Sequence, residues 1–326
     1  MFSFFATKDW FGHMSCSSPE ITESGIRSTI AHPTPAGAGG VLVVVVLYNR
    51  SFKDVPCAAR LMQWLATPTT ASTRLSLAHC LIYDNSPMLQ WLDFGGHERI
   101  DSFHDASNGG TRAAYLYALK IAKAKGCSWI LFLDHDTDLP RDFLLDAERA
   151  LAATVQATPV CAVVPRVFDG LTPISPSKIT SYGRVYGMRD EYAARNSSRG
   201  LTAIASASIV RTDSLEGLFP IPAAFSLDYL DHWLFREMQR RGEVVVMSSA
   251  RVEHALSVQS MTSMSIDRYR SILAAELEFL RSEPQYLAVL HFLWHISRTI
   301  KLMFSTRRPA LVGVCVRAAL NILCIK

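Results

Sequence analysis

The 326-residue sequence lacks several features that would assign it to a common class of protein. Its seven cysteines are scattered, and none forms a Cys-x-x-Cys pair. An odd, unclustered set of cysteines argues against a disulfide framework and a zinc site, and it favours a reducing compartment. No apolar run reaches the ~20 residues that a membrane-spanning helix needs. The N-terminus has no basic stretch followed by an apolar run, so we expect no signal peptide.

Acidic residues are missing from the C-terminal part of the chain, where none follows Glu283. The net charge of +4 therefore belongs to this tail, and the rest of the chain is slightly acidic. This distribution argues against a nucleic-acid-binding body and favours a tail that meets an anionic surface. The cations of the tail are Arg298, Lys301, Arg307, Arg308, Arg317 and Lys326.

The middle of the chain alternates between short apolar runs and amphipathic segments. Residues 1–40 are rich in Ser, Thr, Gly and Pro and predict a flexible lead-in. The alternation after them predicts parallel βαβ units in an open α/β sheet. Strands are expected at 41–49, 79–86, 129–136, 160–167, 201–211 and within 243–254, and helices at 55–67, 109–126, 140–153 and 226–242.

Polar residues stand where the expected strands end. Tyr48 and Asn49 follow the first strand, Asp84 ends the second, and Asp134 and Asp136 end the third. In open α/β sheets, ligands bind in the crevice outside the carboxyl ends of the strands. We therefore expect the functional site at this edge of the sheet.

Asp134 and Asp136 match an Asp-x-Asp metal site. Alternate residues of a strand point to the same side, so the two carboxylates are expected to face one ligand. A divalent cation would relieve their repulsion, and carboxylate oxygens suit Mg²⁺ or Mn²⁺. The alternative is a capped helix start with a solvated turn, since Asp and Pro are common before helices.

Three other residues have both a functional and a structural interpretation. Asp231 lies near the start of an expected helix, on one face with Asp228. It is suited to be a general base; alternatively, it stabilises the N-terminus of the helix. His254 suits a metal such as Mn²⁺, or it is an ordinary core or surface histidine. Asp84 suits a nucleobase N–H or a ribose hydroxyl, or it closes an Asx-turn.

Asn108 precedes two glycines at the start of the expected helix 109–126. A glycine pair lets the backbone approach a ligand closely. Asn108 is equally suited to be the N-cap of this helix.

On the inward face of the later helix 226–242 we expect Leu227, Leu230 and Leu234.

Taken in this order, the segments resemble the family 2 glycosyltransferases of the GT-A fold, and most nearly the bacterial rhamnosyltransferase branch. The resemblance covers about residues 41–279. Its most specific part is the stretch that begins "NGGTRAAY" and ends "WILFLDHDTDLP", similar to the Asn-x-Gly helix and Asp-x-Asp strand of that family. The other similar segments are "VVVVLYN", "LIYDNS", "FSLDYLDHWLFREMQRRG" and "VEHALS".

The resemblance implies an inverting transfer from a nucleotide sugar. Asp136 and His254 would hold Mg²⁺ or Mn²⁺, and Asp231 would be the catalytic base. The implied substrates are dTDP-rhamnose and a hydroxyl of a saccharide or lipid-linked acceptor in surface polysaccharide biosynthesis. The implied donor-binding residues are Tyr48, Asn49, Asp84, Asn108 and Asp134.

The resemblance also divides the chain into a GT-A catalytic domain at 41–256 and a helical, basic extension at 257–326. Within the extension, residues 286–304 and 309–325 predict short apolar helices interrupted by cations. Such helices lie in the membrane interface, or they pack on the catalytic domain or a second subunit. We expect a cytoplasmic protein, peripherally attached to the inner face of the cell membrane.

The sequence departs from the family pattern at three points. Trp233 stands where a second acid is usual after Asp231, Ala274 and Ala275 replace a usual Arg-Asn pair, and "SASIVR" lacks a usual glycine. A non-catalytic binding protein on a decayed transferase fold is therefore an alternative. A nucleotidyltransferase is another, but its Gly-rich loop after the first strand is absent from "LYNRSFKDV".

Overall fold

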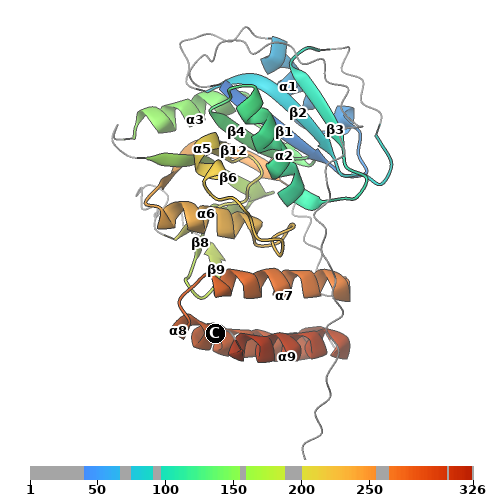
Figure 1. The fold of residues 1–326 in the computed structure, drawn as a ribbon, viewed down its shortest axis with the longest axis vertical. Coiled ribbons are helices and arrows are strands. Elements are labelled where there is room, and N and C mark those ends of the chain that lie inside the picture. Colours follow the sequence, from blue (N-terminus) through green and yellow to red (C-terminus); the bar gives the residue numbers. More distant parts are fainter. Residues whose placement is uncertain are drawn as a thin grey trace, which may run out of the picture. The chain divides into compact units, whose positions relative to one another are not determined.

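The computed structural model describes residues 40–66, 75–90, 97–154, 159–187, 200–254, 264–306 and 308–324 (Figure 1). All of them belong to one compact unit, Ala31–Lys326. The lead-in predicted for residues 1–40 lies outside the described residues, apart from Gly40.

A nine-stranded sheet forms the centre of the described structure, with the strand order β3-β2-β1-β4-β11-β6-β12-β5 and β7 paired to β6. Strands β10, β8 and β9 form a smaller antiparallel sheet. The strands are β1 (Gly40–Leu47), β2 (Ser76–Asp84), β3 (Ile100–His104), β4 (Trp129–Asp134), β5 (Thr137–Asp138), β6 (Val160–Asp169), β7 (Thr172–Ser175), β8 (Ser177–Ile179), β9 (Val185–Gly187), β10 (Leu201–Thr202), β11 (Ile209–Arg211) and β12 (Val244–His254).

Helices cover both faces of the sheet. The side chains of β1 alternate between two apolar cores, with Leu42 and Val44 in one and Val43 and Val45 in the other. The first core contains residues of α2, α5 and α6, and the second contains residues of α1 and α3. The helices of these layers are α1 (Ala58–Ala66), α2 (Gly110–Ala124), α3 (Phe143–Ala152), α5 (Thr212–Glu216) and α6 (Leu230–Arg240).

The predicted open, mostly parallel α/β sheet is confirmed. Strands β1, β2, β3 and β4 are mutually parallel where they pair, and β6 is parallel to β12. The sequence did not predict that β11 lies between β4 and β6 and runs antiparallel to both. Periodicity indicates that a segment is a strand, but not which strands it pairs with or in which direction.

The helix expected at 226–242 begins later, at Leu230. The expectation that Leu227 lies on the inward face is wrong, since 46% of this residue is exposed. Tyr229 has a left-handed backbone, with φ of 58°. The chain therefore changes direction just before the helix, and the residues ahead of it do not follow the helical period.

Three C-terminal helices follow: α7 (Ile266–Arg281), α8 (Tyr286–Thr306) and α9 (Pro309–Leu323), which agrees with the helices predicted at 286–304 and 309–325 (Figure 1). They share a small core that includes Leu273, Leu302 and Leu311. Two other residues of α7, Ala275 and Phe279, belong to the core on one face of the large sheet. Among the described helices, none is long and apolar enough to cross a membrane.

A buried ion-pair network joins α7 to α8. Arg298 donates to both carboxylate oxygens of Glu276, at 3.1 and 2.6 Å. Burial raises the pKa of Tyr229, and this tyrosine lies close enough to Glu276 for the carboxylate to add to the rise. His291 bonds the Tyr182 carbonyl through Nδ1, and its Nε2 lies 3.5 Å from Glu276. Arg298, counted above among the cations of the tail, is therefore neutralised inside the protein.

We predict that Glu276→Ala lowers the free energy of unfolding by about 3–5 kcal/mol, because it leaves Arg298 partly buried without its partner. Chemical denaturation monitored by circular dichroism measures this change. The matched control is Glu278→Ala, which removes a more exposed pair with Arg281 on the same helix. Its expected cost is about 0–1 kcal/mol, and equal costs for the two variants would contradict the network's role.

Candidate functional site

The site is built on the point where the strand order of the large sheet reverses. Strand β2 pairs with one side of β1, and β4 pairs with the other, both in parallel. The register places Asp84 beside Leu47 and Asp134 beside Val46, at the carboxyl ends of the strands. A crevice forms at such a reversal, which is where the sequence predicted the site.

Asp134, Asp136 and His254 come together, with potential ligand atoms that all lie within 4.8 Å of one another. The local structure differs from the expected single strand, because β4 ends at Asp134 and Asp136 lies in the turn before β5. Strand β5 then pairs with β12, and this pairing sets Thr137 opposite His254. The turn and the strand pairing, rather than alternation along one strand, bring the three side chains together.

This cluster fits a divalent cation. The Oδ1 atom of Asp136 is buried without a hydrogen-bond partner among the described residues, and it lies 3.3 Å from His254 Nδ1. Burial raises the pKa of Asp134 to about 7; His254 opposes this rise, and Asp136 and Asp231 add to it. Two carboxylates and an imidazole are suitable ligands for Mn²⁺ or Mg²⁺, which would relieve this electrostatic cost.

Two buried hydroxyls, not singled out in the sequence, support the cluster. Ser206 Oγ accepts a hydrogen bond from the Asp134 N–H at 2.9 Å and lies 2.6 Å from Thr137 Oγ1. Thr137 Oγ1 in turn lies 2.9 Å from His254 Nδ1. Partners of this kind fix the orientation of metal ligands. Two features of the sequence could have indicated these hydroxyls: the threonine directly after the Asp-x-Asp motif and the serines of "SASIVR".

Asp231 lies in the first turn of α6, and its Oδ2 accepts the N–H of Ala205 at 3.0 Å. Ala205 directly precedes Ser206, so one short segment contacts both Asp231 and the metal cluster. Burial raises the pKa of Asp231 to about 6; Ala205 opposes this rise, and the charge of Asp228 adds to it. A carboxylate with a pKa near neutrality is suited to accept a proton from a substrate.

Asp228 is not on the helix that carries Asp231, so the expectation of a shared helix face is wrong. It precedes α6 and forms an ion pair with Arg268 of α7. The next residue, Tyr229, contacts Phe279 of the same helix, with 5.9 Å between ring centroids. Helix α7 therefore holds the two residues that lead into α6 and position Asp231.

The two residues after Asp231 have structural surroundings. Trp233, at the position of the missing acid, is buried and stacks on Phe225 with 5.4 Å between ring centroids. His232 Nδ1 lies 2.7 Å from Thr202 Oγ1, and burial lowers the pKa of His232 to about 4. His232 is therefore neutral at physiological pH and carries no charge into the site.

The residues predicted to bind a donor lie beside the same edge of the sheet. Asp84 is buried and accepts the N–H groups of Ser86 and Gln90, each at 2.9 Å, which is the Asx-turn considered above. The Asn49 N–H donates to Ser86 Oγ at 2.8 Å, and the adjacent Tyr48 is exposed. Each carboxylate oxygen of Asp84 has a second lone pair, but this residue is fully buried in the described structure.

Asn108 is not the N-cap of α2, which is Gly109. Asn108 instead has a left-handed backbone with φ of 52°, and Asp105 accepts the Gly109 N–H at 3.0 Å. At Gly110, which has φ of 75°, a Cβ atom would lie 2.6 Å from the Ser226 carbonyl oxygen. This glycine is therefore required where α2 approaches the segment before α6.

A second group of possible metal ligands consists of Glu276, His291 and His295. Here Arg298 already binds both oxygens of Glu276 and lies 3.1 Å from His295 Nδ1. A guanidinium in this position repels a metal cation, so we interpret the group as the structural network described above.

Comparisons with known proteins support the fold. No protein-family model matches the sequence, and no curated protein matches it. Among solved structures, GalNAc-T7 with UDP, GalNAc and Mn²⁺ is similar, with a TM-score of 0.50 and 10% identity over 74% of this chain. The match covers 48% of GalNAc-T7, about half its length. S. aureus TarS with UDP-GlcNAc has a TM-score of 0.49 and 13% identity, over 86% of this chain and 81% of TarS. The fold is that of the GT-A glycosyltransferases, as predicted.

We predict that Mn²⁺ raises the melting temperature of the protein and that this effect shrinks as the pH falls below about 7. Protons compete with the cation, because the pKa of Asp134 is raised to about 7 and the ligands must be deprotonated. At about 100 times Kd the stabilisation is about 2.7 kcal/mol. Differential scanning fluorimetry at several pH values, with and without Mn²⁺, measures it.

The matched variants for this prediction are Asp136→Ala and Asp138→Ala. Asp138 is an exposed acid two residues further on, outside the cluster. Stabilisation by Mn²⁺ should disappear in Asp136→Ala and persist in Asp138→Ala. An unchanged response in Asp136→Ala would remove this residue from the metal site.

Proposed function

We propose that the protein is an inverting, metal-dependent glycosyltransferase that moves a sugar from a nucleotide sugar to a hydroxyl group. The main observation is that one segment, Ala205 and Ser206, contacts both a cluster fit for a cation and a separate carboxylate, Asp231, with a raised pKa. A transferase needs these two groups side by side. GalNAc-T7, whose structure holds UDP and Mn²⁺ on a similar fold, supports the nucleotide and metal parts of this proposal.

The donor side of the proposed site is formed by the carboxyl ends of β1, β2 and β4. Asp136 and His254 would hold Mg²⁺ or Mn²⁺, with Asp134 beside them. The cation, when bound, neutralises the diphosphate of the donor and stabilises the leaving group. Asp84 would accept hydrogen bonds from the base. Tyr48, Asn49 and Asn108 would complete the donor site.

The acceptor side is formed by Asp231. Its carboxylate removes the proton from the acceptor hydroxyl while the oxygen attacks the anomeric carbon. The bond from this carbon to the diphosphate breaks, and the nucleoside diphosphate leaves on the opposite face. One displacement with one base inverts the configuration and needs no covalent intermediate.

For the donor we propose dTDP-rhamnose, with a saccharide or lipid-linked acceptor in surface polysaccharide biosynthesis. This proposal comes from the resemblance of the Asp-His-Asp-Thr segment, residues 134–137, to the rhamnosyltransferase branch. A panel of dTDP-rhamnose, UDP-glucose, UDP-galactose and GDP-mannose tests it by release of free nucleotide, with Mn²⁺ and with EDTA. Metal-dependent release from a different donor would replace rhamnose, and donor binding without release would favour a decayed transferase.

We further propose that α8 and α9 attach the protein to the inner surface of a membrane. Each helix packs one side on the protein and leaves apolar side chains on the other. No acidic residue follows Glu283, so α8 and α9 carry no acidic side chain that an anionic membrane would repel. Such a helix pair suits the membrane interface. The exposed apolar residues are Tyr286, Val289, Leu290, Leu293, Ile300, Met303, Phe304, Val316, Leu320 and Leu323.

We predict that Asp231→Asn lowers kcat by about 10²–10⁴-fold and leaves donor binding intact, because the amide cannot accept the proton. Initial rates of nucleotide release and donor affinity by calorimetry separate the two effects. The matched control is Asp213→Asn, an exposed acid in the first turn of α5. If Asp231 only stabilises a helix N-terminus, both variants will behave alike and the base must be sought elsewhere.

The pH profile gives a second measurement on the same variant. The base must be deprotonated, so kcat/KM should rise as the pH increases through the pKa of Asp231. This pKa is raised to about 6. A bound cation lowers it, and the rise in kcat/KM then lies at a lower pH. This rise should be absent from the residual activity of Asp231→Asn.

We predict that Leu293→Glu with Phe304→Glu releases the protein from vesicles, because charges on this face oppose burial in the interface. Flotation with phosphatidylglycerol-containing vesicles measures binding. Deletion of the helices is a poorer test, since it also removes the partner of Glu276. Equal flotation of the wild type and the variant would contradict the proposed attachment.

A further inference from the structure

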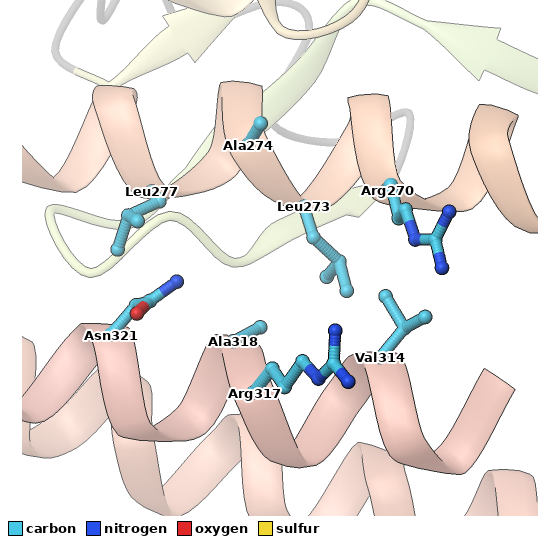
Figure 2. Close-up of a pocket in the computed structure, with 8 residues that line it drawn as sticks. All are labelled: Arg270, Leu273, Ala274, Leu277, Val314, Arg317, Ala318 and Asn321. Carbon is cyan, nitrogen blue, oxygen red and sulfur yellow. The ribbon is translucent and has the colours of Figure 1, made fainter. Parts of the chain in front are cut away.

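A groove of about 260 Å³ lies between α7 and α9, apart from the site at the carboxyl edge of the sheet (Figure 2). Its walls are mostly apolar, with Leu273, Ala274 and Leu277 on α7 facing Val314 and Ala318 on α9. Ligand pockets usually have about 300–1,000 Å³. The groove is therefore suited to one segment of an apolar chain rather than to a whole ligand.

Two arginines lie beside the apolar walls. Figure 2 shows Arg270 and Arg317 beside Val314, with Leu277 and Asn321 toward the other end of the groove. Arg270 donates to Asp267 at 2.8 Å, but Asp267 is 90% exposed, so this pair contributes little. Arg317 has no ion pair or side-chain hydrogen bond with the part of the chain that the structure describes. The residues that line the groove therefore include two cations and no acid.

We propose that this groove binds an anionic membrane lipid, with the phosphate on Arg270 and Arg317 and a segment of an acyl chain along the apolar walls. Guanidinium groups bind phosphate with paired hydrogen bonds, and the two like charges are best placed when an anion lies between them. The apolar walls require that the anion carry a hydrocarbon chain, which a free phosphate lacks.

The position of the groove favours a bilayer as the source of this lipid. Arg317, which lines the groove, is three residues before Leu320, so these two side chains are neighbours on the surface of α9. Val316 and Leu320 belong to the exposed apolar face assigned above to the membrane. The groove thus opens beside that face, where a long cationic side chain can reach the phosphate level of the lipids. This inference rests on the proposed membrane attachment and does not depend on the proposed chemistry.

The experiment compares flotation of the full-length protein with vesicles of phosphatidylcholine alone and with added phosphatidylglycerol. We expect the double variant Arg270→Gln with Arg317→Gln to bind the anionic vesicles about 30-fold more weakly than the wild type. Ala274→Phe fills the groove without changing the charge, and we expect a loss of about tenfold.

The matched control is Arg281→Gln on the same helix. Arg281 is an exposed arginine paired with an acid three residues earlier, as Arg270 is, but it does not line the groove. Binding of this control should stay within about twofold of the wild type. An equal loss in the control would mean diffuse attraction to the anionic surface and would overturn the proposal, as would full binding by Ala274→Phe.

Two further arms separate the possible outcomes. Release of the wild type from vesicles by inorganic phosphate, but not by equal ionic strength of chloride, would identify a site for free phosphate and overturn the lipid. Nucleotide release without vesicles should be unchanged in the double variant, so transferase activity is judged independently. If the wild type binds no vesicles, both the membrane attachment and this inference fail while the chemistry stands.

Discussion

The candidate site depends on the electrostatic cost of three carboxylates, those of Asp134, Asp136 and Asp231, at the desolvated edge of one sheet. Burial alone raises the pKa of Asp134 and Asp231, and each added negative charge raises it further. The surrounding structure reduces this cost through His254 and the Ala205 N–H, but the buried Oδ1 of Asp136 remains without a donor among the described residues. A site that holds repelling acids together without neutralising them is prepared for a cation.

Much of the site could be predicted from the sequence, because its main residues follow apolar strands. Asp84 and Asp134 end β2 and β4, and parallel strands bring their carboxyl ends to one edge. The contacts of Ser206 with Asp134 and Thr137 could not be predicted, since they join segments 72 and 69 residues apart. Side-chain contacts at such separations depend on the folded topology and leave no periodic signal.

The errors in the sequence-based interpretation have the same origin. Local spacing predicts that Asp228 shares the helix of Asp231, whereas the ion pair of Asp228 with Arg268, 40 residues away, lies outside any local window. The charge pattern assigns Arg298 to the cations of the tail, although Glu276, 22 residues earlier, neutralises it. Charge patterns record how many charges a segment has, and only the packing decides which of them remain available to a partner.

The ties between α7, α8 and the start of α6 have a mechanical consequence. Arg298 on α8 binds Glu276 on α7, Arg268 on α7 binds Asp228, and Asp228 is three residues before Asp231. The Arg298–Glu276 contacts are 3.1 and 2.6 Å long, and Glu276 is buried. A protein resting on a bilayer through α8 and α9 would keep Asp231 at a constant height above the lipid. It would then select acceptors by the distance between their reactive hydroxyl and the membrane surface.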